Sequence, residues 1–134
     1  MDMQRNLTAA QAAYVAFAKG DRQPFIDLIG PDCAISYYGD PARIPWAGTY
    51  AGPEGFAEML GRIGAHLEIG EYRATEFLPS GNALVVLGVG RGVARRSGIR
   101  FDAHWAHYIR YRGDRAVEFG VYNDTLALAA AAGL

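Results

Sequence analysis

The stretch Ile44–Met59 reads Ile-Pro-Trp-Ala-Gly-Thr-Tyr-Ala-Gly-Pro-Glu-Gly-Phe-Ala-Glu-Met. Its first half continues a segment rich in Gly and Pro, so residues 39–52 are expected to form a loop. Pro53 suits the first turn of a helix, where its missing N–H breaks no hydrogen bond. From Phe56 to Leu67 the apolar side chains recur every three or four residues, and this spacing predicts a helix with one face toward the core.

Two helices and one strand are expected before this stretch. Thr8 and Gln11 have the spacing of a capping box, and they open an alanine-rich helix that ends at Gly20. A second helix is expected over Arg22–Ile29, with a proline in its first turn. The period then changes, and Cys33–Tyr38 has the pattern of a strand.

Beyond Gly70 the chain has the pattern of strands joined by short turns. The expected strands are Glu71–Leu78, Ala83–Ala94, Phe101–Tyr111 and Ala116–Asn123. Three successive short connections predict an antiparallel meander, and Asp124 is expected to cap a last helix that runs to Ala132. The order of elements predicts one α+β domain over residues 1–134, in which a curved antiparallel sheet packs on the N-terminal helices around an apolar pocket.

Composition limits the classes of protein to consider. The chain has 134 residues, 51% of them hydrophobic, and a net charge of −1, which is the balance of a globular protein with no polyanionic partner. The arginines between residues 91 and 100 carry no interleaved aromatic platform, so no nucleic acid is expected there. Cys33 is the only cysteine, which excludes an internal disulfide. Met1–Thr8 is too polar for a signal peptide and no stretch is long enough to cross a membrane, so a cytoplasmic location is expected.

A family resemblance rests on three motifs. The pattern W-x-G-x-x-x-G-x-E-G within Ile44–Met59 resembles the segment that leads into the third helix of SnoaL-like proteins. Gly20-Asp21 and Asp124-Thr125 are also similar to that family, which belongs to the nuclear-transport-factor-2-like (NTF2-like) superfamily. The resemblance implies a cone-shaped sheet around a pocket. It leaves the reaction open, because the superfamily includes isomerases, polyketide cyclases, hydrolases, dehydratases and non-enzymatic modules.

The pocket can be mapped from strand alternation. Along Phe101–Tyr111, His107 lies on the more apolar face, where it is the one titratable group. It is the candidate acid or base, and Tyr37 or Asn123 is the candidate hydrogen-bond donor to a developing oxyanion. Tyr37 and Trp46 are expected to close the entrance. The expected apolar walls are Tyr14, Phe17, Trp46, Phe56, Met59, Trp105, Ile109, Phe119 and Val121. The alternative is a purely structural role for His107, because a buried strand histidine is often a hydrogen-bonded core residue.

The resemblance also implies a departure from ketosteroid isomerase. In that family an Asp base ends the first strand, and a Tyr on the first helix joins an Asp on the penultimate strand in the oxyanion hole. Aligned with the family, Tyr37 stands at the position of the base and His107 at that of the oxyanion-hole Asp, while Tyr14 is out of register by about one residue. Steroid isomerisation by that mechanism is therefore not expected.

Two classes of function remain open. One is an isomerase- or cyclase-type acid–base enzyme acting on a small hydrophobic carbonyl compound, and the other is a non-catalytic module for ligand binding or dimerisation. No cofactor is expected. The glycines of Gly88-Val-Gly-Arg-Gly do not form a dinucleotide-binding fingerprint, because the strand continues on both sides of them, and they suit bending of a curved sheet. No metal site is expected, since His104 and His107 face opposite ways. A homodimer is expected to cover the outer sheet face, where Ala106 and Tyr108 lie.

Overall fold

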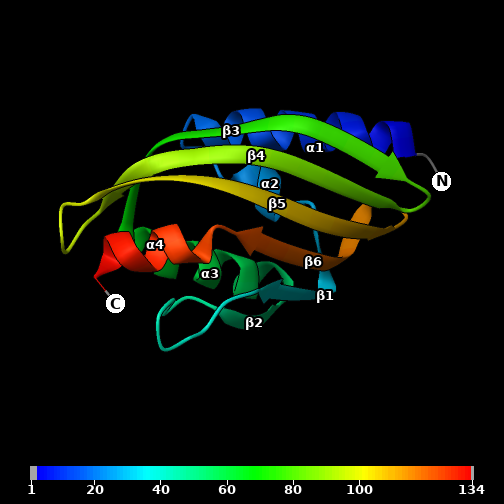
Figure 1. Cartoon of the computed structure of the whole chain (residues 1–134). Helices are drawn as coiled ribbons and strands as arrows, with labels where there is room; N and C mark the ends of the chain where they lie inside the picture. The colour runs from blue at the N-terminus through cyan, green and yellow to red at the C-terminus, as the bar shows by residue number, and fades with distance from the viewer. Residues whose placement is uncertain (1–2, 134) are drawn as a thin grey trace.

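The computed structural model describes residues 3–133, so residues 1, 2 and 134, which include the start of Met1–Thr8, lie outside the described range. The chain begins with helices α1 (Met3–Ala18) and α2 (Gln23–Ile26) (Figure 1). The remaining elements are β1 (Ile29–Tyr37), β2 (Gly48–Ala51), α3 (Gly52–His66), β3 (Leu67–Ser80), β4 (Ala83–Ala94), β5 (Arg100–Arg112), β6 (Arg115–Asn123) and α4 (Thr125–Ala132).

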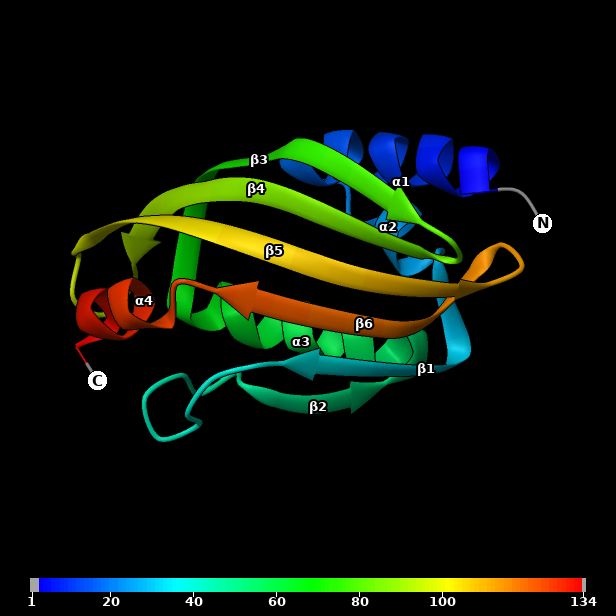
Figure 2. The same cartoon turned by 45° about the vertical axis from the view of Figure 1, so that its right-hand side comes forward.

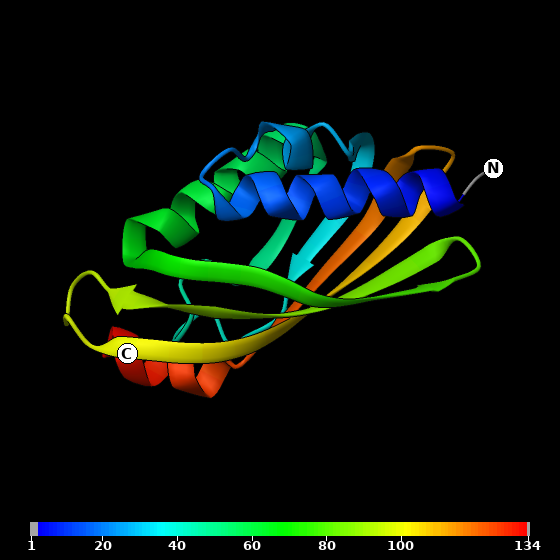
Figure 3. The same ribbon diagram turned by 90° about the horizontal axis from the view of Figure 1, so that it is seen from above.

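The strands form one curved six-stranded sheet in the order β2-β1-β6-β5-β4-β3. β3 to β6 are an antiparallel meander, as their short connections predicted, and β2 pairs antiparallel with β1. The expected all-antiparallel sheet is wrong at one position, because β1 pairs parallel with β6 and the sheet is mixed (Figure 2). In Figure 3 the helices α1, α2 and α3 lie on one side of the sheet, while α4 contacts β4 and β5 at one end.

The N-terminal boundaries differ from those expected. The first helix already includes Met3, five residues before the expected cap. Thr8 does not cap it; the Thr8 hydroxyl instead donates to the backbone carbonyl of Gln4 at 3.0 Å. The second helix ends at Ile26 rather than Ile29, since Ile29 already pairs with β6. Part of the expected loop 39–52 is the short edge strand β2. Asp124 caps α4 as expected, with its Oδ1 accepting from the Ala127 N–H at 3.3 Å.

The glycines of β4 leave space for aromatic side chains of β5. The inner face of β4 has Gly88 opposite Trp105 and Gly92 opposite Phe101. A Cβ on Gly88 would lie 2.1 Å from Cζ2 of the Trp105 indole, so the ring occupies the space that any larger residue would need. Small residues on β4 therefore let large aromatic side chains of β5 lie flat across the neighbouring strand.

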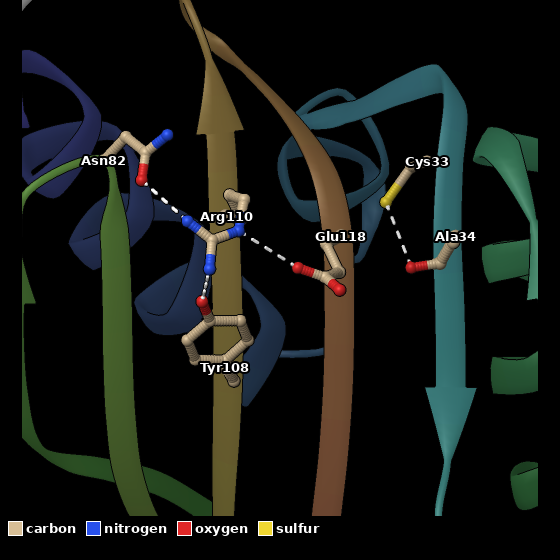
Figure 4. Close-up of polar contacts among 6 residues, drawn as sticks. All are labelled: Cys33, Ala34, Asn82, Tyr108, Arg110 and Glu118. Carbon is tan, nitrogen blue, oxygen red and sulfur yellow. Dashed lines mark hydrogen bonds and ion pairs between the residues drawn. The ribbon is translucent and has the colours of Figure 1, made fainter.

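The outer face of the sheet carries polar contacts beside exposed aromatic groups. Figure 4 shows Arg110, whose Nη1 donates to Asn82 Oδ1 at 2.9 Å and whose Nε donates to Glu118 Oε1 at 3.1 Å; the guanidinium also contacts the Tyr108 hydroxyl. The rings of Tyr38 and Tyr122 stack with centroids 4.7 Å apart, and each residue is 49% exposed. No helix among residues 3–133 is long and apolar enough to span a bilayer.

Candidate functional site

A cavity of about 510 Å³ lies between the concave face of the sheet and the helices. Its volume falls within the range of small-molecule sites. The lining is mostly apolar, because each surrounding element turns its hydrophobic face inward. The walls include Phe17 of α1, Phe25 of α2, Phe56 and Met59 of α3, and Phe119 and Val121 of β6.

The inner face of β5 supplies the principal polar group. As the alternation predicted, every second residue of this strand is buried, and Trp105 and His107 line the cavity side by side. His107 is 6% exposed, and its ring centroid lies 4.3 Å from that of Trp105. A histidine in this place is held among aromatic rings, with little water around it.

Two tyrosine hydroxyls lie at the two ring nitrogens of His107. Tyr14 Oη is 2.6 Å from Nδ1, and Tyr72 Oη is 3.4 Å from Nε2. Burial lowers the pKa of His107 to about 3, since water no longer solvates the imidazolium, so the ring is neutral at physiological pH. Burial also raises the pKa of both Tyr14 and Tyr72, and their hydroxyls therefore stay protonated.

Stacked rings hold these groups in place. Tyr72 stacks on Trp105 with centroids 4.7 Å apart and planes 9° from parallel, and Tyr14 lies over the same indole at 5.7 Å. Such aromatic pairs contribute roughly 0.5–1.5 kcal/mol each beyond the area they bury. The polar atoms of the site are thus carried by side chains with little freedom to rotate.

A second polar pair lies on a different part of the cavity wall. Asn123 Nδ2 donates to Tyr37 Oη at 3.3 Å, and burial raises the pKa of Tyr37. Arg22 and Arg95 also line the cavity. No Asp or Glu is among its lining residues, and no cluster of His, Cys, Asp or Glu suited to a metal ion occurs within residues 3–133. The cavity therefore offers hydrogen-bond donors and positive charge, but no carboxylate base.

The structure brings most of the candidate site residues to this cavity. Those that line it are Phe17, Tyr37, Phe56, Met59, Trp105, His107, Phe119, Val121 and Asn123. Three candidates lie elsewhere. Tyr14 is behind His107 and 3% exposed, Ile109 is packed in the core, and Trp46 is fully buried instead of closing the entrance.

Tyr72 is the main residue that the sequence did not single out. It lies on β3, where shifts in the pairing with β4 between residues 69 and 71 and between 74 and 76 interrupt simple alternation. The alternation rule therefore fails to place its ring on the inner face. The sequence feature that could have indicated Tyr72 is the row of glycines on β4, because small residues there leave space for aromatic rings from neighbouring strands.

Burial accounts for the behaviour of the single cysteine. Cys33 is buried on β1, and this burial raises the pKa of its thiol to about 11. The thiol is therefore protonated at neutral pH and is a poor nucleophile.

A cone of curved sheet that encloses a cavity against its helices is the NTF2-like fold, which ketosteroid isomerase-like proteins share, so the resemblance read from Ile44–Met59 is confirmed for the fold. An NTF2-like protein of unknown function from Burkholderia pseudomallei is 23% identical and superposes with a TM-score of 0.87, covering 98% of this chain and 99% of that one. An NTF2-like protein from Burkholderia xenovorans is 27% identical, with a TM-score of 0.80 and 96% of each chain covered.

A third solved structure is that of TerC co-crystallised with polyporic acid. It is 22% identical, with a TM-score of 0.83, and covers 96% of this chain and 98% of TerC. No family model and no curated protein matches the sequence.

Proposed function

We propose that the protein is an isomerase- or cyclase-type enzyme that promotes proton transfer in a small, largely apolar carbonyl compound. The observation that carries this proposal is a neutral histidine, held by a tyrosine at 2.6 Å, on the wall of an apolar cavity of about 510 Å³. A neutral imidazole polarises a carbonyl by hydrogen bonding without bringing an unpaired cation into the cavity. TerC, which has the same fold, was co-crystallised with a small organic acid, polyporic acid.

The missing carboxylate limits the substrate. Because no Asp or Glu lines the cavity, proton abstraction falls to a weak base such as a water molecule. A weak base removes a proton from carbon efficiently only when neighbouring groups make that proton acidic. The expected substrate is therefore an activated ketone, such as one whose reacting carbon lies between two carbonyls.

Keto–enol interconversion of benzoylacetone, followed by ultraviolet absorbance, tests this function. General acid–base catalysis contributes about 10²–10⁴-fold, so the wild-type protein is expected to accelerate the interconversion by about 100-fold or more. His107→Gln is expected to remove the acceleration. His104→Gln is the matched control, since His104 lies on the same strand but is exposed on the outer face. Equal rates for wild type and His107→Gln count against the proposal.

A second candidate function is non-catalytic binding of the same class of ligand. The low pKa of His107, about 3, favours it, because this histidine then does not titrate near neutral pH. Binding of benzoylacetone with no change in its interconversion rate would select this function over catalysis.

We also propose that the protein forms a homodimer through the outer face of the sheet. Tyr122 and its stacking partner Tyr38 are half exposed beside this face, and Leu78 at its β3 edge is 45% exposed. A second copy with the same patch would cover these groups by two-fold symmetry.

A further inference from the structure

The Tyr14 hydroxyl determines which nitrogen of His107 carries the proton. Among residues 3–133, Tyr14 Oη has no hydrogen-bond partner other than His107 Nδ1. If Nδ1 carried the proton, it would donate to Tyr14, and the Tyr14 O–H would then be buried without an acceptor. An orphaned buried donor is costly, so Tyr14 donates to Nδ1 and the proton of the neutral ring is on Nε2.

This tautomer leaves two donors close together on the cavity wall. The His107 Nε2–H faces Tyr72 Oη at 3.4 Å, which is long for a hydrogen bond between these atoms. The Tyr72 hydroxyl has no other hydrogen-bond partner among the described residues, and both side chains line the cavity. Each therefore has hydrogen-bonding capacity that the protein leaves largely unused.

We propose that His107 Nε2–H and Tyr72 O–H together bind one oxygen of the ligand, a carbonyl or enolate oxygen. The inference deepens the proposed function, on which it rests, by naming the group that is bound and the two donors that bind it. An oxygen that accepts from both gives each donor the acceptor it lacks, and paired donors stabilise negative charge that develops on a carbonyl oxygen.

Three residues acquire distinct roles from this arrangement. His107 acts as a hydrogen-bond donor rather than as a base, and Tyr72 is a second ligand-binding residue. Tyr14 is a positioning residue, since it acts on the ligand only by fixing the His107 tautomer. Asn123 Nδ2 donates to Tyr37 Oη, and these two side chains form a separate polar pair on another part of the cavity wall.

Long-range ¹H–¹⁵N NMR distinguishes the two tautomers of each of the three histidines, and His107→Gln assigns the signal of His107. The expected result is the Nε2–H tautomer in the wild-type protein. Tyr14→Phe, which keeps the ring but removes the donor, is expected to raise the Nδ1–H population. An Nδ1–H tautomer in the wild-type protein overturns the proposal.

A ketone and its parent hydrocarbon then test the binding of the oxygen. α-Tetralone and tetralin have the same carbon skeleton and differ by one carbonyl. Loss of one hydrogen bond is expected to weaken α-tetralone binding by about five-fold in Tyr72→Phe and to leave tetralin binding unchanged. Tyr37→Phe is the control, because this tyrosine also lines the cavity, and it is expected to change neither affinity.

Each other outcome contradicts the inference. Equal loss of both probes in Tyr72→Phe means that the hydroxyl maintains the shape of the cavity and does not bind the ligand oxygen. Selective loss of α-tetralone in Tyr37→Phe places the oxygen at the other polar pair. No binding of α-tetralone up to its solubility limit also overturns it. Because these measurements involve no turnover, they stand apart from the benzoylacetone assay: selective α-tetralone binding without catalysis supports the donor pair and rejects the enzyme.

Discussion

Replacing Gly88 by alanine tests how the aromatic wall of the cavity is built. The new Cβ would lie 2.1, 2.4 and 2.5 Å from Cζ2, Cε2 and Cη2 of Trp105, far inside van der Waals contact. The indole must therefore turn off β4 and lose its stacking on Tyr72 at 4.7 Å and on His107 at 4.3 Å. Overpacking costs about 1–3 kcal/mol and each of the two lost ring contacts about 0.5–1.5 kcal/mol, so we expect the free energy of unfolding to fall by about 2–6 kcal/mol.

Gly90→Ala is the matched control, two residues along the same face of the same strand. A Cβ there would lie 3.7 Å from Cδ2 of Tyr72 and 3.8 Å from Cδ1 of Trp105, which is ordinary contact. Neither glycine has a positive φ, so backbone strain does not separate the two substitutions. Because alanine loses less conformational entropy on folding than glycine, we expect Gly90→Ala to be neutral or stabilising by up to about 1 kcal/mol.

Urea unfolding followed by tryptophan fluorescence measures both variants. The quantity compared is the free energy of unfolding in water, with the slope against urea checked for change. If Gly88→Ala and Gly90→Ala unfold with the same free energy as each other, the packing of Trp105 against β4 is not what the structure indicates, and the stacked wall around His107 loses its support.

Three further results are expected. First, the pKa of His107 is lowered to about 3 in the folded protein from an unfolded value near 6.5, so the free energy of unfolding is highest above pH 6.5 and falls by up to roughly 1.4 kcal/mol per pH unit between about 6.5 and 3. His107→Gln lacks this pH dependence, and parallel pH profiles of the two proteins contradict the prediction. Second, light scattering at micromolar concentration gives the mass of a dimer, whereas a monomer rejects the outer-face interface. Third, a β,γ-unsaturated ketosteroid is not converted, because no Asp or Glu lines the cavity to act as the base; appreciable conversion refutes this reading.

Local patterns predicted the fold well where neighbouring residues determine it. The hairpins between β3 and β6 follow from short connections rich in Gly, and the bounds of β4 agree with those expected. β2 was missed because Gly48–Ala51 pairs only with β1 and lies among glycines and prolines. The parallel pairing of β1 with β6 joins distant parts of the chain, and no local pattern reports it.

The sequence predicted part of the candidate site, where a regular strand pattern determines which way a side chain points. Strand alternation placed His107 on the inner face beside Trp105, because β5 pairs with β4 in a regular register from Arg100 to Arg110. The contact between Tyr14 and His107 spans 93 residues, and the sequence indicated Tyr14 as an apolar wall, about one residue out of register with the oxyanion-hole Tyr of the resembled family. Tyr72 was missed because pairing shifts on β3 disturb the alternation that would have revealed it.

The central claim is that binding in the cavity depends on His107. The most direct test is the change in melting temperature that benzoylacetone produces in the wild-type protein, in His107→Gln and in His104→Gln. We predict the same increase for wild type and His104→Gln, and a clearly smaller one for His107→Gln, which lacks the imidazole donor. An undiminished increase in His107→Gln would contradict the account, because the ligand would then bind without the histidine.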